Sequence, residues 1–367
     1  MSLSISRIKK RILTFLQNRI YLNRNKKGIS FLQNRISLNQ NKNIFIDGYK
    51  VFSESGVTPQ SAYYALINLY CLTNGKFNED INRKIISFNP PLSIKNTRDE
   101  FFGKLDKADY EKINITLNND GYYCFDKQLP AETCKKLYDY ALKNQATGRG
   151  FDSKVLYNPN NPISEIYRYD FNMVDLINNE DIQQLIMNPA LINVARNYLG
   201  CEPVFDFPGM WWSAGYKKEA LSDSAQLYHF DMDRIKWLKI FFYINDVTPE
   251  NGPHCYIKHS HKPGNKPMEL LKRGYVRIPD EDLKKYYKQE DFIELCGDAG
   301  SIIAGDTKCW HKGKHLTKGH RLVMQLEYTS SLFGANYPKM VVKKSSDAFK
   351  EFCKNNSRYS SNIHFNN

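Results

Sequence analysis

The feature that most limits which fold this chain can adopt is an apolar, aromatic stretch that begins with two polar side chains. In residues 226–248, His229 and Asp231 are separated only by Phe230, and a run rich in Trp, Leu, Ile, Phe and Tyr follows. Side chains alternate between the two faces of a strand, so a strand here points His229 and Asp231 the same way. An imidazole and a carboxylate on one face are two of the three protein ligands of a non-haem Fe(II) site. The stretch therefore predicts a β-structure and a metal centre that needs a second His.

The rest of the pattern predicts helices followed by many short strands. Thr58 and Pro59 predict a helix over 60–72, with Thr58 as N-cap and Pro59 as its first residue. Further helices are expected over 131–144 and over 181–198, the second ending at Gly200. A turn that enters a strand is expected over 117–125, and strands are expected over 203–207, 210–214, 225–231, 238–245, 254–258, 301–304 and 320–329. This order predicts a mainly β fold with added helices (α+β), a barrel or sandwich with helices packed outside.

Composition divides the chain into four predicted parts: a basic extension (1–46), a helical layer (47–114), the strand-rich domain (115–332) and a polar end (333–367). The extension repeats the sequence of residues 15–20 at 31–36. It holds ten Lys or Arg and no acid, so most of the net charge of +13 lies there. It is either a mobile extension, a membrane-surface segment or an organelle-targeting peptide.

The remaining body is close to charge balance and shows no base-reading motif, so no nucleic-acid partner is expected. The eight cysteines are scattered and form no CxxC pair, which is typical of reduced thiols in a cytoplasmic protein. No apolar run reaches the roughly 18 residues that a membrane span needs.

A second His follows a predicted strand far downstream. His311 lies eighty residues after Asp231, and Arg321 follows ten residues later at the start of the last long strand. His315 and His320 compete with His311 as the third ligand. An Arg just inside a barrel strand can form a bidentate pair with the far carboxylate of a keto acid that chelates iron.

With these residues in order, region 115–331 resembles the phytanoyl-CoA dioxygenase family of Fe(II)- and 2-oxoglutarate-dependent oxygenases. The matching pieces are His229-x-Asp231, the Asn-Gly turn and strand within 248–262, Gly305-Asp306, His311-x-Gly313 and Arg321. One departure is His259, which stands where the family carries the Gly of a Gly-Ser-His ending. The departure changes a turn and leaves the expected ligands intact.

The resemblance implies a double-stranded β-helix, also called a jelly roll or cupin-type barrel. It implies that His229, Asp231 and His311 hold Fe(II), that Arg321 binds 2-oxoglutarate, and that O2 is the second co-substrate. The implied reaction hydroxylates an unactivated C–H of a small-molecule, glycan- or lipid-linked metabolite and releases succinate and CO2. The carboxylate of Asp231 takes the position that a halide would need, which favours hydroxylation over halogenation.

Weaker expectations concern residues near the ligands. Gln226 and Lys239 either contact 2-oxoglutarate or are a strand-edge residue and a barrel salt bridge, respectively. Trp211 and Trp212 point to opposite faces of a strand, so one belongs to the core and the other lines the substrate pocket. Arg234, with its neighbour Lys236, either meets an anionic substrate or is solvated.

Two alternatives to an enzyme stay open at this point. One is a non-enzymatic cupin-type module that binds a metal or ligand. The other is a membrane-surface adaptor that acts through residues 1–46, in which case the tail makes a peripheral membrane contact. The polar excursion over 263–291 is expected to cover the barrel mouth, where substrate loops usually lie.

Overall fold

The fold is that of a computed structural model, which describes residues 38–93, 97–99, 101–149, 151, 153–163, 165–214 and 226–366. Both copies of the N-terminal repeat lie outside these residues. Among the described helices, none combines the length and hydropathy of a membrane-spanning segment.

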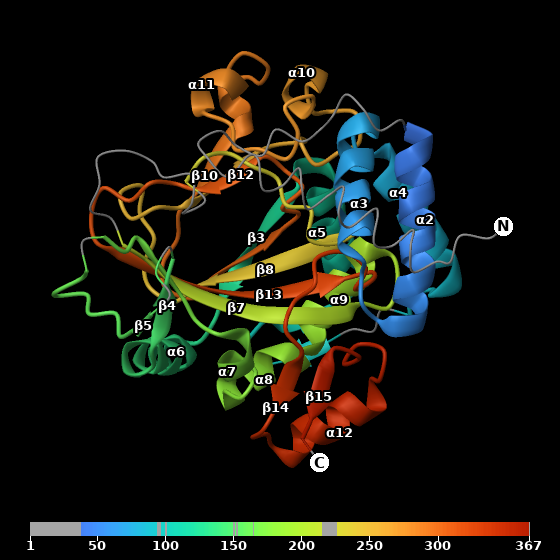
Figure 1. The fold of residues 1–367 in the computed structure, drawn as a ribbon. Coiled ribbons are helices and arrows are strands. Elements are labelled where there is room, and N and C mark those ends of the chain that lie inside the picture. The colour runs from blue at the N-terminus through green and yellow to red at the C-terminus, as the bar shows by residue number, and fades with distance from the viewer. Residues whose placement is uncertain are drawn as a thin grey trace.

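Two antiparallel sheets form the centre of the molecule (Figure 1). The large sheet has the order β3 (Tyr122–Gln128), β11 (Ser301–Gly305), β8 (Trp237–Tyr243), β13 (His320–Thr329), β7 (Val204–Ala214), β6 (Arg168–Asp170), β4 (Ala146–Gly148), β5 (Lys154–Val155). The small sheet has the order β10 (Phe292–Leu295), β9 (His254–Ile257), β12 (His311–Gly313). The predicted fold class, a jelly-roll barrel flanked by helices, is confirmed.

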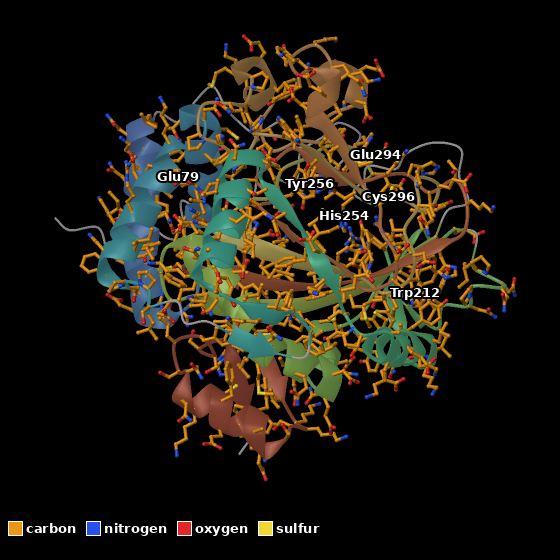
Figure 2. The ribbon with its side chains drawn as sticks, turned by 180° about the vertical axis from the view of Figure 1, so that it is seen from behind. Glu79, Trp212, His254, Tyr256, Glu294 and Cys296 are labelled. Atoms are coloured by element: carbon orange, nitrogen blue, oxygen red, sulfur yellow. The ribbon has the colours of Figure 1, made fainter. Side chains whose placement is uncertain are left out.

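Alternation along β8 separates the barrel interior from the helix-covered face. Phe241 and Tyr243 join an interior cluster with Tyr256 of the small sheet, and Figure 2 shows His254 and Tyr256 between the two sheets. Ile240 and Phe242 belong instead to the large core cluster on the other face. Lys239 shares the inward parity of Phe241, so the strand itself directs this lysine toward the interior.

Helices cover the outer face of the large sheet. They are α5 (Lys107–Asp120), α6 (Ala131–Lys143), α7 (Met173–Leu176), α8 (Glu180–Met187) and α9 (Pro189–Leu199). The two short strands β1 (Thr97–Asp99) and β2 (Gly103–Leu105) form a hairpin before α5. The excursion over 263–291 contains α10 (Met268–Leu271), α11 (Asp280–Leu283) and the 3-10 helix η2 (Gln289–Asp291).

A layer of three helices packs beside the barrel: α2 (Leu38–Ser55), α3 (Gln60–Thr73) and α4 (Lys76–Phe88) (Figure 1). Its buried side chains share one cluster with Phe230 and Trp310, which lie next to the expected metal ligands. The helical layer therefore supports the back of the candidate site. The predicted boundary after residue 46 falls inside α2, and the domain limits stay predictions.

Four local predictions need correction, two about helices and two about strands. Thr58 does not cap α3: the N-cap is Pro59, and the Thr58 hydroxyl accepts the N–H of Gly334 instead (3.0 Å). The helix expected over 181–198 is two helices, because Asn188 caps α9 with its side chain and Pro189 cannot continue α8.

The strands expected over 203–207 and 210–214 are one strand, β7. Pro208 pairs with Leu326 of β13 on one edge of β7. On the other edge β6 pairs only with residues 211–213, so among the described residues no strand there needs an N–H from Pro208. The strand expected over 225–231 does not form as a continuous strand. Tyr228 and His229 make only isolated bridges, to Ile278 and His311.

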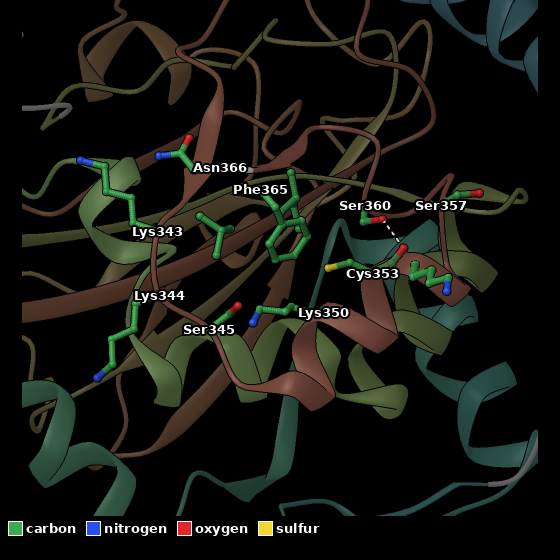
Figure 3. Close-up of a pocket in the computed structure, with 12 residues that line it drawn as sticks. Lys343, Lys344, Ser345, Lys350, Cys353, Ser357, Ser360, Phe365 and Asn366 are labelled. Atoms are coloured by element: carbon green, nitrogen blue, oxygen red, sulfur yellow. Dashed lines mark hydrogen bonds between the residues drawn. The ribbon is translucent and has the colours of Figure 1, made fainter.

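The polar C-terminal residues form a small unit of two strands and a helix. Strands β14 (Met340–Val342) and β15 (Ile363–Phe365) pair in parallel, and α12 (Asp347–Asn355) packs beside them. Buried Phe349, Tyr359 and Ile363 join this unit to the main core. A cavity of about 710 Å3 opens here, with an apolar floor and a rim that includes Lys343, Lys344, Lys350 and Lys354 (Figure 3).

Candidate metal centre

Three side chains meet at one point of the barrel: His229, Asp231 and His311. One ligand atom from each lies within 4.8 Å of the others. The Nε2 atoms of His229 and His311 are 3.7 Å and 3.6 Å from the two Asp231 carboxylate oxygens, and the two rings are 4.3 Å apart between centroids. Two imidazoles and one carboxylate on one side of a point match the ligand set of a non-haem Fe(II) site.

Backbone pairing places these ligands. His229 and His311 exchange both backbone hydrogen bonds, at 3.0 and 2.8 Å, and Asp231 N–H donates to Thr307 O at 2.8 Å. The chain before β12 is thereby joined directly to the His229–Asp231 segment. These few backbone hydrogen bonds are sufficient to position the three ligands, because they fix the backbone at His229, Asp231 and His311 without a long strand ladder.

Each imidazole is oriented by the carbonyl two residues before it. The Nδ1 atoms of His229 and His311 lie 3.0 Å from Leu227 O and Cys309 O. A proton on Nδ1 makes these hydrogen bonds and leaves the Nε2 lone pair directed at the shared point. Burial lowers the pKa of both imidazoles, which favours the neutral form that binds a metal.

The carboxylate of Asp231 is bound by a lysine. Lys239 Nζ lies 2.8 Å from Asp231 Oδ2, 3.2 Å from Asp233 Oδ2 and 3.3 Å from Glu327 Oε2. Burial raises the pKa of Asp231, but the Lys239 ammonium and the two imidazoles lower it more, so its pKa lies well below the ordinary value. Lys239 therefore makes the barrel salt bridge that the sequence left open.

Arg321 presents unused hydrogen-bond donors in the interior. Its side chain is buried on β13, and among the described residues it makes one hydrogen bond, from Nη2 to Ser213 Oγ at 3.5 Å. Nε and Nη1 are buried without a hydrogen-bond partner among the described residues. Gly313 leaves room beside it, since a Cβ there would lie 3.0 Å from Nη2. Such orphaned donors of a buried cation fit a ligand carboxylate, as 2-oxoglutarate would supply.

Comparison with known proteins agrees with this geometry. The family model of phytanoyl-CoA dioxygenase (PhyH) matches residues 117–323, more than half of the chain. The chain belongs to the phytanoyl-CoA dioxygenase family. It is thus a non-haem iron oxygenase that uses Fe(II), 2-oxoglutarate and O2. The donor set and the orphaned Arg321 nitrogens fit both the metal and the keto acid.

Solved structures with low sequence identity resemble parts of this family member. AviO1 from Streptomyces viridochromogenes is 14% identical over 64% of this chain and 100% of that chain, with a TM-score of 0.42. EctD from S. alaskensis is 18% identical over 70% and 90%, with a TM-score of 0.44. HygX from Streptomyces hygroscopicus, solved with nickel and 2-oxoglutarate, is 13% identical over 67% and 94%, with a TM-score of 0.46. No curated protein matches the chain.

Other predicted residues of this dioxygenase lie near the centre or away from it. Gln226 is buried, and its Oε1 lies 3.2 Å from Nδ1 of His315, so its contact with 2-oxoglutarate stays a prediction. Trp211 belongs to the interior cluster, under the Arg168 guanidinium at 4.1 Å from its ring centroid. Trp212 packs on the opposite face against Tyr138 of α6, with ring centroids 5.2 Å apart (Figure 2), so its predicted substrate role has no support.

Arg234 is neither solvated nor directed at a substrate. It is buried and forms a bidentate pair with Asp206, at 2.5 and 2.7 Å, and its Nη1 donates to Ala335 O. The interpretation of Arg234 as a substrate contact is corrected to a structural ion pair. Its neighbour Lys236 lies over the Tyr198 ring at 4.8 Å, and burial lowers the pKa of this lysine.

Two further histidines, His320 and His259, have structural partners. His320, a competitor for the third ligand, packs against Trp212 with ring centroids 5.3 Å apart, and Tyr138 Oη lies 3.0 Å from its Nε2. His259 adopts a positive φ of 64°, the backbone form for which Gly is the usual residue. The family's Gly is thus replaced without loss of the turn, and His259 Nδ1 lies 2.6 Å from Asn119 O.

Sequence reasoning missed Asp233 and Glu327, which share Lys239 with a candidate ligand. A signal was present, because Glu327 follows Arg321 by six residues in one strand and alternation places both on the same face. An acid on the inward face of a strand that is predicted to be buried indicates a buried basic partner.

Proposed function

We propose that this oxygenase hydroxylates an unactivated C–H of a small-molecule, glycan- or lipid-linked metabolite and releases succinate and CO2. The observation that supports it is the meeting of His229, Asp231 and His311 within 4.8 Å, with the buried donors of Arg321 on the same barrel interior. The retained Asp231 carboxylate favours hydroxylation, since no position is left for a halide.

Each residue has a defined part in this proposal. His229 and His311 would offer Nε2 to Fe(II), with their orientation fixed by Leu227 O and Cys309 O. Asp231 would supply the anionic ligand, and Arg321 would bind the distal carboxylate of 2-oxoglutarate. Bound Fe(II) with 2-oxoglutarate and O2 supplies the oxidising power for C–H hydroxylation.

The residues around the centre would keep bulk water from it. Tyr256, Trp211 and Phe241 fill the interior beside it and are almost fully buried. The excursion over 263–291 reaches the centre from the other side, where Tyr275 packs against Phe230 at 5.4 Å between ring centroids. We place the substrate-facing wall there. No nucleic-acid partner is proposed, and the membrane contact of residues 1–46 and the cytoplasmic location stay predictions.

The first experiment measures binding and turnover with purified protein. The wild-type protein should bind Fe(II) anaerobically, bind 2-oxoglutarate only when metal is present, and consume O2 with formation of succinate. His311→Ala should abolish metal-dependent binding of 2-oxoglutarate. Binding is the decisive readout, because turnover without the native substrate is slow in such enzymes.

His320→Ala is the matched control for the third ligand. It removes a nearby His that packs against Trp212 and should leave metal binding unchanged in the folded protein. Loss of metal binding in His320→Ala, with metal binding retained in His311→Ala, would contradict the proposed ligand set.

A further inference from the structure

Lys239 is held at the metal centre by three carboxyl groups. It is 6% exposed and belongs to β8, paired across the sheet with Glu327 of β13 and Gly305 of β11. Its Nζ contacts Asp231, Asp233 and Glu327 at 2.8, 3.2 and 3.3 Å. A rigid strand in the middle of the large sheet therefore fixes the position of this ammonium group against a candidate iron ligand.

The contact is specific to one oxygen of Asp231. The two oxygens lie equally near the imidazoles, because Oδ1 is 3.7 Å from His229 Nε2 and Oδ2 is 3.6 Å from His311 Nε2. Lys239 distinguishes them, since its Nζ donates to Oδ2 at 2.8 Å. A carboxylate oxygen that accepts a charge-assisted hydrogen bond is a weaker ligand for a metal than the other oxygen of the same group. The Lys239 contact therefore favours Oδ1 as the ligand atom.

A one-oxygen carboxylate is what an oxygenase of this kind needs. A carboxylate can bind a metal through both oxygens, and the second oxygen would then take a coordination position. Three protein donor atoms leave positions open for a chelating keto acid and O2, and a fourth donor removes one of them.

We propose that Lys239 is a positioning residue that holds Asp231 as a one-oxygen ligand and so keeps the position for 2-oxoglutarate free. The inference rests on the proposed ligand set. Asp233 and Glu327 also contact the ammonium, at 3.2 and 3.3 Å, and so help to hold it in place beside Asp231.

A purely structural ion pair looks different in this chain. Arg234 and Asp206 match each other one to one, and both nitrogens of the fork find an oxygen. Lys239 faces three carboxyl groups, and both oxygens of Glu327 lack a hydrogen bond within the described residues. Three carboxyl groups around one ammonium group are suited to a nearby divalent cation, which supports a role of Lys239 in positioning the metal ligand Asp231.

The test is Lys239→Met, which removes the charge and keeps the length of the side chain. We expect metal affinity within about threefold of wild type and 2-oxoglutarate affinity for the metal-loaded protein lower by about 10- to 100-fold. With Co(II) as the probe, the visible absorption of Lys239→Met should weaken as the metal gains a ligand. Lys239→Arg, which keeps a cationic donor, should restore most of the 2-oxoglutarate affinity.

Lys308→Met is the matched control, because Lys308 is another buried lysine that faces two carboxylates, Asp306 and Glu79, both at 3.4 Å. It should lower stability and leave the Co(II) spectrum unchanged. If Lys239→Met does not fold, the double variant Lys239→Met with Glu327→Gln removes one buried acid as well and is measured in the same way.

The outcomes separate the two proposals. A wild-type protein that binds neither Fe(II) nor 2-oxoglutarate overturns the proposed ligand set. A wild-type protein that binds both, beside a Lys239→Met protein with the same 2-oxoglutarate affinity and the same Co(II) spectrum, overturns the role of Lys239 alone.

Discussion

Buried polar side chains of this molecule fall into two groups, which differ in how many of their polar atoms make hydrogen bonds. In the paired group, Arg234 meets Asp206 through two hydrogen bonds, and His261 uses Nε2 toward Asn118 O and Nδ1 toward the Cys309 thiol. In the open group, Arg321 leaves two nitrogens and Glu327 leaves two oxygens without a hydrogen bond among the described residues.

The difference separates structure from function. A buried polar group without a hydrogen bond costs free energy, so a cluster of such groups beside candidate metal ligands is a candidate ligand-binding site. The paired group is closed within the chain and offers nothing to a ligand. In the open group, Glu327 shares Lys239 with Asp231, and Arg321 lies in the same strand beside Gly313 of the His311 strand. The unused donors of Arg321 match a keto acid, and the acid of Glu327 matches a nearby cation. Substitutions in the paired group should therefore change the free energy of unfolding, and those in the open group should change ligand affinity.

The largest effect is expected in the paired group. Asp206→Asn keeps the shape of the side chain and leaves the buried Arg234 charge without its counter-ion, which should cost about 3–5 kcal/mol of stability. The measurement is the free energy of unfolding in urea. Metal affinity of the folded protein should stay unchanged, because Asp206 contacts none of the three candidate ligands.

Lys135→Met is its control, since it removes an exposed pair with Asp139 and should change stability little. A variant Asp206→Asn that unfolds like wild type but loses metal would break the comparison, because the Arg234–Asp206 pair would then belong to the open group.

The sequence was sufficient for the fold class because its signals are local. Alternating apolar residues, Pro and Gly predict most strands and helices, and β13 has the predicted bounds 320–329. The His-x-Asp spacing predicts that two side chains point the same way, and the structure achieves this through an isolated bridge at His229 and a backbone bond from Asp231 to Thr307. His311 and Arg321 follow from their positions at a strand end and a strand start, although their roles as metal and keto-acid ligands stay predictions.

What the sequence could not predict depends on partners distant along the chain. Arg234 looked exposed because Asp206 lies 28 positions earlier, and Glu327 lies 88 positions after Lys239. Thr58 looked like a helix cap, yet it binds Gly334. In each case a tertiary contact overrides a local preference, and such contacts become visible only once the strands are in register.

The second prediction uses pH to test the paired group. Burial lowers the pKa of His261 from 6.5 to about 4, so the unfolded chain takes up this proton first as the solution is acidified. The contribution of His261 to the free energy of unfolding is fully present above pH 6.5. It is lost as the pH falls toward 4, and the total loss is about 3 kcal/mol.

His261→Gln removes the titrating group, so urea midpoints measured across this pH range should fall less steeply than those of wild type. The comparison of the two slopes isolates His261 from His254 and His320, whose pKa values burial also lowers. Equal slopes would show that the neutral form of His261 is not what the Cys309 and Asn118 contacts require.

The third prediction moves to the open group. Arg321→Met removes the orphaned donors, so stability should hold or rise slightly, while 2-oxoglutarate affinity should fall about 100-fold, or about 2.7 kcal/mol. Calorimetric titration of metal-loaded protein gives the affinity, and metal affinity should stay within about twofold. A large loss of stability with normal 2-oxoglutarate binding would move Arg321 into the paired group.

The smallest effect concerns the space beside Arg321. A Cβ at Gly313 would lie 3.0 Å from Arg321 Nη2, so Gly313→Ala should push the guanidinium by a few tenths of an ångström and weaken 2-oxoglutarate binding about fivefold, or about 1 kcal/mol. The decisive measurement is a double-mutant cycle, in which Gly313→Ala is added to Arg321→Met. If Gly313 acts only through the guanidinium, the second substitution should have no further effect on 2-oxoglutarate affinity. An equal fivefold loss in both backgrounds would show instead that Gly313 contacts the keto acid itself, and that β12 as well as β13 contributes to its site.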